Sequence, residues 1–365
     1  MAVKLIKLKY WSKEFVHFLR QKFYRPNLQQ ITLLLSSLEE VPLTAVELNM
    51  WTDAISDLIV STCLQRMSSK DIGLLIAGLI AYNKNGLTPN LTQLALVRMF
   101  ERTNGVAQEL IYRSTSIANT SNVDNCDSFI GHLTAEQENT VLQELRVNGY
   151  SVLPIKLSNE KCHLLIELAR KFSYCHRDDR SMILNAEALD KGAINGSIAC
   201  LDHQISGSPA FNSLANDSLL INLASQYLGQ KVEAQNSALW WTYPDKHASS
   251  EAAQLFHYDL DSLRWLKLFV YLNDVTEFNG PHEYVAGTHK PGSKPSHLLL
   301  RNYSRLEDKH IDSEPSLQRK KILGPAGTLI LADTRCFHKG ANPIHGVRIL
   351  YTAVYAPNRF VFDLA

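Results

Sequence analysis

The chain has 365 residues, of which 45% are hydrophobic, enough for one large domain or two unequal ones. Lys and Arg number 37 against 36 Asp and Glu, so the net charge of +1 excludes a global electrostatic attraction to nucleic acid or to acidic membranes. The six cysteines form no CxxC pair and no regular framework, which argues against a zinc ribbon or a secreted disulfide scaffold and favours reduced thiols in the cytoplasm.

The first part of the chain is expected to be helical and to lack a transmembrane segment. It begins without a signal-peptide pattern, and its longest apolar stretch, residues 72–82, is shorter than the roughly 20 residues that a membrane-spanning helix needs. Apolar residues recur at three- and four-residue spacing over 44–64 and 91–111, which predicts amphipathic helices. The basic segment 4–25 is either a solvated helix or a contact for a membrane surface or a protein partner.

Residues 113–131 are rich in Ser, Thr, Asn and Asp, and hydrophobic periodicity fades there. Such a composition is typical of a linker. We therefore place a domain boundary in it, with a helical region of unknown role over residues 1–125 and a second domain over residues 126–365.

The second domain opens with helices and continues with strands. Thr134 and Gln137 form a capping-box pattern that predicts a helix ending near Gly149. A strand over 150–155 and helices over 158–172 and 217–228 follow. Short apolar or alternating runs then predict strands over residues 234–243, 253–259, 265–272, 328–331 and 348–355. This order indicates a mainly β fold, a sandwich or jelly roll of antiparallel strands flanked by helices.

Three residues of this domain suit a metal site. His257 and Asp259 are two residues apart, and in a strand this spacing points both side chains to the same face. His338, after a predicted strand and before a Gly-Asn-Pro turn, is the candidate third ligand. Two His and one carboxylate leave coordination positions open, the arrangement of non-haem Fe(II) oxygenases. Asp261 is the alternative carboxylate.

An anionic 2-oxo acid on such a metal needs a cationic partner at its far end. Arg348 lies ten residues after His338, and a hairpin between them would bring both to one end of a barrel. Arg suits the role because its planar fork pairs both oxygens of a carboxylate. Lys267 and Tyr271 share strand parity and are further candidates for cosubstrate binding. Surface pairing is the alternative for Arg348, and a solvated edge position for Lys267.

Taken together, the ordered motifs resemble the phytanoyl-CoA dioxygenase family of Fe(II)- and 2-oxoglutarate-dependent oxygenases. They comprise residues 148–154, 227–229, 257–259, 271–275, 279–281, 287–290 and 324–327, with His338 and Arg348. The resemblance covers roughly residues 145–356. It implies a double-stranded β-helix (jelly-roll, cupin-like) fold, Fe(II), 2-oxoglutarate and O2 as cofactors, His257, Asp259 and His338 as metal ligands, and Arg348 as the partner of the distal carboxylate.

Other conspicuous residues have less specific interpretations. His282, His289 and His345 are expected in loops or in support of the site, and Cys336 as a packed thiol. One residue of the Trp240-Trp241 pair is expected to face the barrel interior. Residues 301–321 carry many charges without strand periodicity and are expected to form a long loop, a candidate lid. A basic cluster over 161–180 offers a place for a CoA phosphate or is a solvated face.

The expected function is hydroxylation of an unactivated C–H of a small molecule, with release of succinate and CO2. Within the family, halogenating members replace the metal carboxylate by a small residue, and Asp259 is present here, so hydroxylation, desaturation or ring closure is implied. The alternative is a non-catalytic jelly roll that binds a metal or a small acid, with the helical region as its interaction module.

Overall fold

The computed structural model describes residues 87–88, 90–106, 108–109, 112, 128–179, 181–184, 189, 194–201, 203–260, 262–299, 305–357 and 361–362. The segments 4–25, 44–64 and 72–82 lie outside the described residues, and so do residues 113–127 of the expected linker. The helix expected over 91–111 is present in its first part as α5 (Asn90–Thr103).

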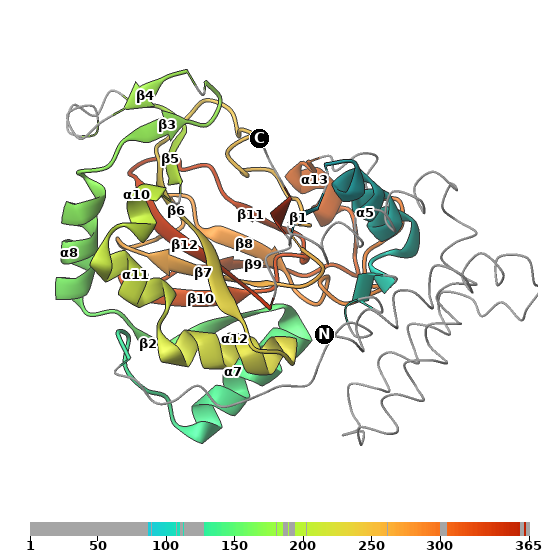
Figure 1. The fold of residues 1–365 in the computed structure, drawn as a ribbon. Coiled ribbons are helices and arrows are strands. Elements are labelled where there is room, and N and C mark those ends of the chain that lie inside the picture. The colour runs from blue at the N-terminus through green and yellow to red at the C-terminus, as the bar shows by residue number, and fades with distance from the viewer. Residues whose placement is uncertain are drawn as a thin grey trace, which may run out of the picture.

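The described chain is mainly antiparallel β sheet with helices (Figure 1). Its larger sheet has the strand order β2-β10-β7-β12-β6-β5-β3-β4. These strands are β2 (Tyr150–Lys156), β3 (Tyr174–His176), β4 (Ile183–Leu184), β5 (Ser197–Leu201), β6 (Glu233–Thr242), β7 (Leu266–Tyr271), β10 (Thr328–Ala332) and β12 (Arg348–Ala356). A smaller sheet has the order β11-β8-β9, with β8 (His282–Val285), β9 (Arg319–Ile322) and β11 (His338–Gly340). Separately, β1 (Leu87–Thr88) pairs in parallel with β13 (Val361–Phe362).

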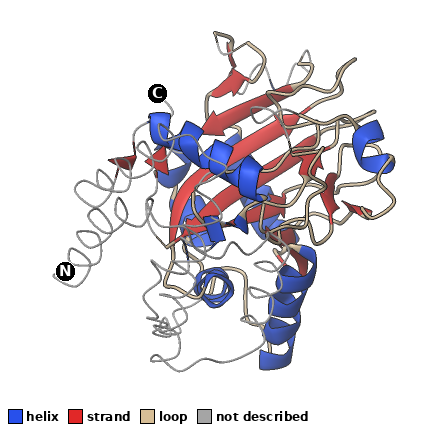
Figure 2. Ribbon diagram, turned by 90° about the vertical axis from the view of Figure 1, so that its right-hand side faces the viewer, coloured by secondary structure: helices blue, strands red, loops and turns tan. Residues whose placement is uncertain are grey.

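Helices cover one face of the larger sheet (Figure 2). They are α7 (Ala135–Asn148), α8 (Asn159–Ala169), α10 (His203–Ser206), α11 (Pro209–Ala215) and α12 (Ser218–Leu228). Their apolar side chains, such as Leu145 and Leu220, join Leu239 and Tyr351 of the sheet in one buried core. The opposite face of the sheet packs against the smaller sheet, where Phe269 and Leu350 meet Tyr284. This arrangement is consistent with the expected jelly roll.

Local sequence signals set the helix ends as expected. Thr134 and Gln137 form a reciprocal capping box at the start of α7, and Gly149, with a φ of 86°, ends that helix in the left-handed conformation. Asp217 caps α12, and Gly229 ends it. The predicted strands over 150–155, 234–243, 265–272, 328–331 and 348–355 are confirmed as β2, β6, β7, β10 and β12.

Three expectations were wrong. Over 253–259 the chain forms only isolated bridges at Phe256 and His257, not a regular strand. Segment 301–321 is no uninterrupted loop, because it holds α13 (Asp308–Asp312) and most of β9. β11 and β12 form no hairpin: β11 pairs with β8, whereas β12 pairs with β6 and β7. For residues 256–257, β9 and β12, pairing with segments distant in sequence decided the conformation.

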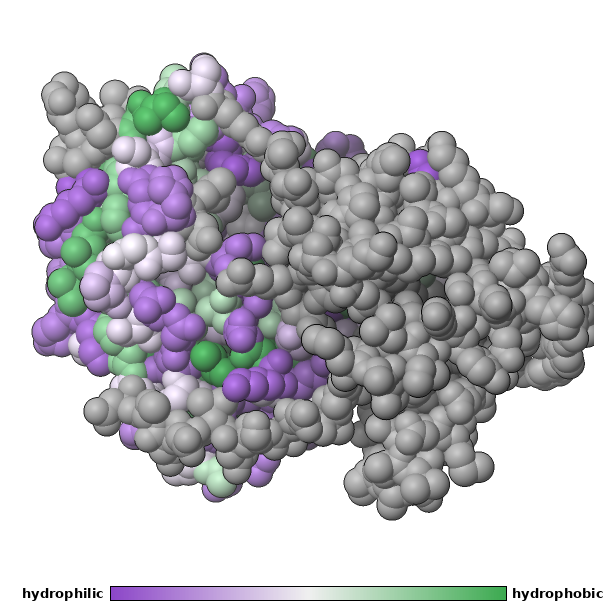
Figure 3. Space-filling view, viewed as in Figure 1, coloured by the Kyte–Doolittle hydropathy of each residue, from purple (hydrophilic) through white to green (hydrophobic). Residues whose placement is uncertain are grey.

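On the face shown in Figure 3, hydrophobic and hydrophilic residues of the described chain are interspersed. Among the described helices, none is both long enough and apolar enough to cross a bilayer.

Candidate metal centre

His257, Asp259 and His338 come together between the two sheets. One ligand atom from each lies within 4.8 Å of the others. The Nε2 atoms of His257 and His338 each lie 3.6 Å from an oxygen of Asp259, and the two imidazole rings are 4.3 Å apart. No other such group of His, Cys, Asp and Glu occurs among the described residues.

Backbone pairing fixes this juxtaposition. The amides of His257 and His338 exchange hydrogen bonds with each other's carbonyls at 2.9 and 2.8 Å, as in an antiparallel pair. The Asp259 amide donates to the carbonyl of Thr334 at 2.8 Å. Two segments about 80 residues apart in sequence thereby hold all three ligands.

Both imidazoles present Nε2 to the centre. Nδ1 of His257 lies 2.9 Å from the Leu255 carbonyl, and Nδ1 of His338 lies 2.9 Å from the Cys336 carbonyl. A carbonyl can only accept, so Nδ1 carries the proton and Nε2 keeps its lone pair. Burial lowers the pKa of both imidazoles, which favours the neutral form that binds a metal.

Asp259 is held as a carboxylate by its neighbours. Burial alone would raise its pKa, but its neighbours, chiefly Lys267 with its Nζ 2.7 Å from Oδ2, outweigh burial and hold the pKa well below its usual range. Lys267 is therefore engaged with a proposed metal ligand. Its expected contact with the cosubstrate stays a prediction.

Arg348 is buried without a carboxylate partner among the described residues. Only 3% of it is exposed. It donates to the carbonyls of Gly280 and Ala341 and to Oγ1 of Thr242, and its buried Nε has no hydrogen-bond partner in the described part of the chain. A Cβ at position 340 would lie 2.7 Å from Nη2 of Arg348, so Gly340 makes room for the guanidinium. Burial lowers the pKa of Arg348 to about 10, which leaves it charged at neutral pH.

The sequence pattern of phytanoyl-CoA dioxygenase (PhyH) matches residues 145–343, more than half of the chain. The chain belongs to the phytanoyl-CoA dioxygenase family. The donor set of this family member fits the expected iron and 2-oxoglutarate, since two neutral imidazoles and a carboxylate suit Fe(II) and an unpaired buried guanidinium suits a carboxylate.

Solved structures resemble it at low identity. AviO1 from Streptomyces viridochromogenes Tue57 is 14% identical over 61% of this chain and 96% of its own, with a TM-score of 0.42. The non-heme alpha ketoglutarate dependent epimerase SnoN from nogalamycin biosynthesis is 19% identical over 61% and 84%, with a TM-score of 0.45. HygX from Streptomyces hygroscopicus, with nickel and 2-oxoglutarate bound, is 19% identical over 62% and 88%, with a TM-score of 0.44. No curated protein matches the chain in sequence.

Other polar side chains of this family member line the space near Arg348. The Tyr271 hydroxyl donates to the Ile322 carbonyl and accepts from the His282 amide, both at 3.0 Å. Its expected role with the cosubstrate stays a prediction. His282 lies on β8, not in a loop. Two residues later, the buried hydroxyl of Tyr284 makes no hydrogen bond to any described residue. Sequence reasoning missed Tyr284, although its parity with His282 was a signal.

The remaining candidates lie apart from the metal group. His289 is buried, with Nε2 3.2 Å from the Arg146 carbonyl. His345 is exposed and stacks on the ring of Phe278. The Cys336 thiol is buried and contacts the Val285 carbonyl at 2.8 Å, and burial raises its pKa to about 11, as expected for a packed thiol. Asp261 lies outside the described residues.

The expectation for the tryptophan pair is confirmed. Trp241 is buried in the core beneath the helices. Trp240 packs with the residues between the sheets, on the face that also carries Arg348.

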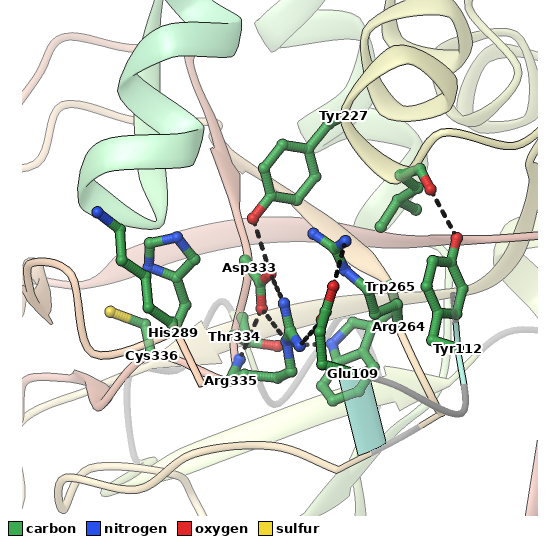
Figure 4. A network of polar contacts seen from close by, with 12 residues as sticks. Glu109, Tyr112, Tyr227, Arg264, Trp265, His289, Asp333, Thr334, Arg335 and Cys336 are labelled. Atoms are coloured by element: carbon green, nitrogen blue, oxygen red, sulfur yellow. Dashed lines mark hydrogen bonds and ion pairs between the residues drawn. The ribbon is translucent and has the colours of Figure 1, made fainter. Parts of the chain in front are cut away.

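A second buried cluster holds the loop before His338 in place (Figure 4). Arg335 forms a bidentate pair with Asp333 at 2.9 and 2.7 Å and contacts Glu109 at 2.9 Å. Glu109 also pairs with Arg264 at 3.2 Å, and Tyr227 donates to Asp333 at 2.8 Å. The residue between Asp333 and Arg335 is Thr334, whose carbonyl accepts from the Asp259 amide. The cluster therefore supports a metal ligand and includes a residue that precedes the expected domain boundary.

Proposed function

We propose that this protein is a non-haem Fe(II)- and 2-oxoglutarate-dependent dioxygenase that hydroxylates an unactivated C–H of a small molecule. The observation that carries the proposal is the meeting of Nε2 of His257, Nε2 of His338 and a carboxylate oxygen of Asp259 within 4.8 Å. Two neutral imidazoles and one carboxylate would hold the iron and leave positions open for 2-oxoglutarate and O2.

When bound, the iron supplies O2 activation coupled to conversion of 2-oxoglutarate to succinate and CO2. The chain supplies position and charge. Leu255 and Cys336 orient the imidazoles through their carbonyls, and Lys267 keeps Asp259 ionised. Arg348 would pair with the distal carboxylate of 2-oxoglutarate, which gives its buried charge the partner that the described chain does not provide.

The same proposal includes the architecture that the family assignment implies. We infer a double-stranded β-helix for the domain from residue 126, preceded by a helical region of unknown role over 1–125. A cytoplasmic location and a surface or protein contact through segment 4–25 stay predictions.

The test is metal and cosubstrate binding together with turnover. The wild type should bind one Fe(II) per chain anaerobically, and 2-oxoglutarate should then bind to that form. His257→Ala should lose both, while His345→Ala, which removes an exposed imidazole, should keep both. Succinate formation with a substrate panel reports turnover. Unchanged iron binding by His257→Ala would falsify the proposed centre, and binding without any succinate would favour the non-catalytic alternative.

A further inference from the structure

Arg305 stands beside the metal ligands without a partner. No carboxylate of the described residues pairs with it, and its Nη1 is buried and has no hydrogen-bond partner among those residues. Arginine side chains are normally paired or solvated when charged. An atom of Arg305 that is neither paired nor exposed is therefore a place where a ligand can bind.

Strand register places Arg305 on the same face as the metal ligands. Phe256 and Leu306 form an antiparallel bridge, exchanging hydrogen bonds at 2.9 and 2.8 Å. One residue along from this bridge, Arg305 lies opposite His257. His257 is bridged in turn to His338, and His338 pairs with Tyr284 on β8. Side chains at opposed positions of adjacent strands project to the same face. Phe256 and Leu306 project to the other face, into a buried apolar cluster.

Electrostatics agree with this placement. Burial is the main cause of the lowered pKa of His257 and His338, and the positive charge of Arg305 lowers both further. Arg348 contributes instead to the lowered pKa of His282, after burial. The two guanidinium groups thus act on different parts of the site: Arg305 beside His257, and Arg348 at the end of β8 and β11, where it contacts Gly280 and Ala341.

We propose that Arg305 binds an anionic group, a carboxylate or a phosphate, of the substrate that is oxidised, so that the protein acts on an anionic small molecule. The proposal rests on the function proposed above, because it assigns Arg348 to 2-oxoglutarate and leaves Arg305 for the second organic ligand. Both carboxylate and phosphate match the planar fork of an arginine.

The experiment uses the full chain loaded with Zn(II), which has no redox chemistry, and saturated with 2-oxoglutarate. The probes are benzoate, hexanoate and phenyl phosphate, each compared with its uncharged counterpart, benzamide, hexanamide or phenol. Shifts of the thermal unfolding midpoint with probe concentration, checked by calorimetry, give the dissociation constants. The carboxylate and phosphate arms show which anion is recognised.

We expect at least one anion to bind the wild type about tenfold or more tightly than its neutral counterpart. Arg305→Gln should abolish that preference and Arg305→Lys should keep part of it, while affinity for 2-oxoglutarate stays unchanged in both. Arg146→Gln, which removes an exposed guanidinium from α7, controls for net charge and should behave as wild type.

Three results would overturn the proposal: no preference for an anion in the wild type, a preference that survives in Arg305→Gln, or a loss of 2-oxoglutarate affinity in Arg305→Gln comparable with that of an Arg348 variant. The function proposed above fails on a different result, namely a wild type that binds neither metal nor 2-oxoglutarate.

Discussion

Arg335 and Arg348 are both buried, but only the charge of Arg335 is paired with carboxylates of the described chain. Arg335 has Asp333 and Glu109 within 2.9 Å, whereas Arg348 has only two carbonyls and one hydroxyl among the described residues. A buried charge is costly unless it is paired. A charge compensated inside the chain stabilises one conformation, and a charge left uncompensated beside a metal centre is available to a ligand.

The largest expected effect is on the compensated charge. Arg335→Met leaves Asp333 without its bidentate partner and Glu109 with Arg264 alone, and should cost about 3–5 kcal/mol of unfolding free energy. Urea denaturation measures this loss, with the exposed Arg146→Met as control. A loss below about 1 kcal/mol would contradict this prediction, because it would be no larger than the contribution of an exposed ion pair.

Arg348→Met should show the opposite pattern. Removing an uncompensated buried charge offsets the loss of three hydrogen bonds, so the stability of the ligand-free protein should change by no more than about 1 kcal/mol. Affinity for 2-oxoglutarate should fall by about 2 kcal/mol or more, roughly 30-fold, because the distal carboxylate loses its partner. Calorimetry on the Zn(II)-loaded protein measures both. Unchanged affinity would remove Arg348 from the cosubstrate site.

His289 shows a third way to bury an ionisable group, as the neutral form. Burial lowers its pKa to about 3, so below pH 6.5 the unfolded chain takes up a proton that the folded protein does not. This contribution to stability is complete above about pH 6.5 and is lost as the pH falls toward 3. The wild type should lose unfolding free energy between pH 7.5 and pH 5.5. In His289→Gln this loss should be smaller by about 1 kcal/mol, because the variant lacks the ionisable imidazole. The exposed His345→Gln should leave that loss unchanged, and an unchanged loss in His289→Gln would contradict the assignment.

The paired cluster around Arg335 also includes a residue of the N-terminal region. Glu109 precedes the boundary expected at residue 125, yet it pairs with Arg264 and Arg335, and Phe100 stacks on Tyr258 at 4.9 Å, between two metal ligands in sequence. Gln108 donates to the carbonyls of Ser262 and Leu263. The end of the first region therefore supports the loops that carry the metal ligands, whatever role its earlier residues have.

The sequence by itself determined the features that depend on local chemistry. The Thr134 capping box, the Gly149 and Gly229 helix ends and the alternating strands follow from neighbours along the chain. The ordered motifs also sufficed to indicate the family.

Only the tertiary structure decided which distant residues meet. The pairing of His257 with His338, the bridge that sets Arg305 beside them, and the division of arginines between Arg335 and Arg348 all depend on contacts between segments far apart in sequence. The sequence predicts a loop over 301–321 because β9, at the end of this segment, has no strand periodicity and forms by pairing with β8. Local propensity cannot report whether a buried charge will find a partner, because that partner is chosen by the fold.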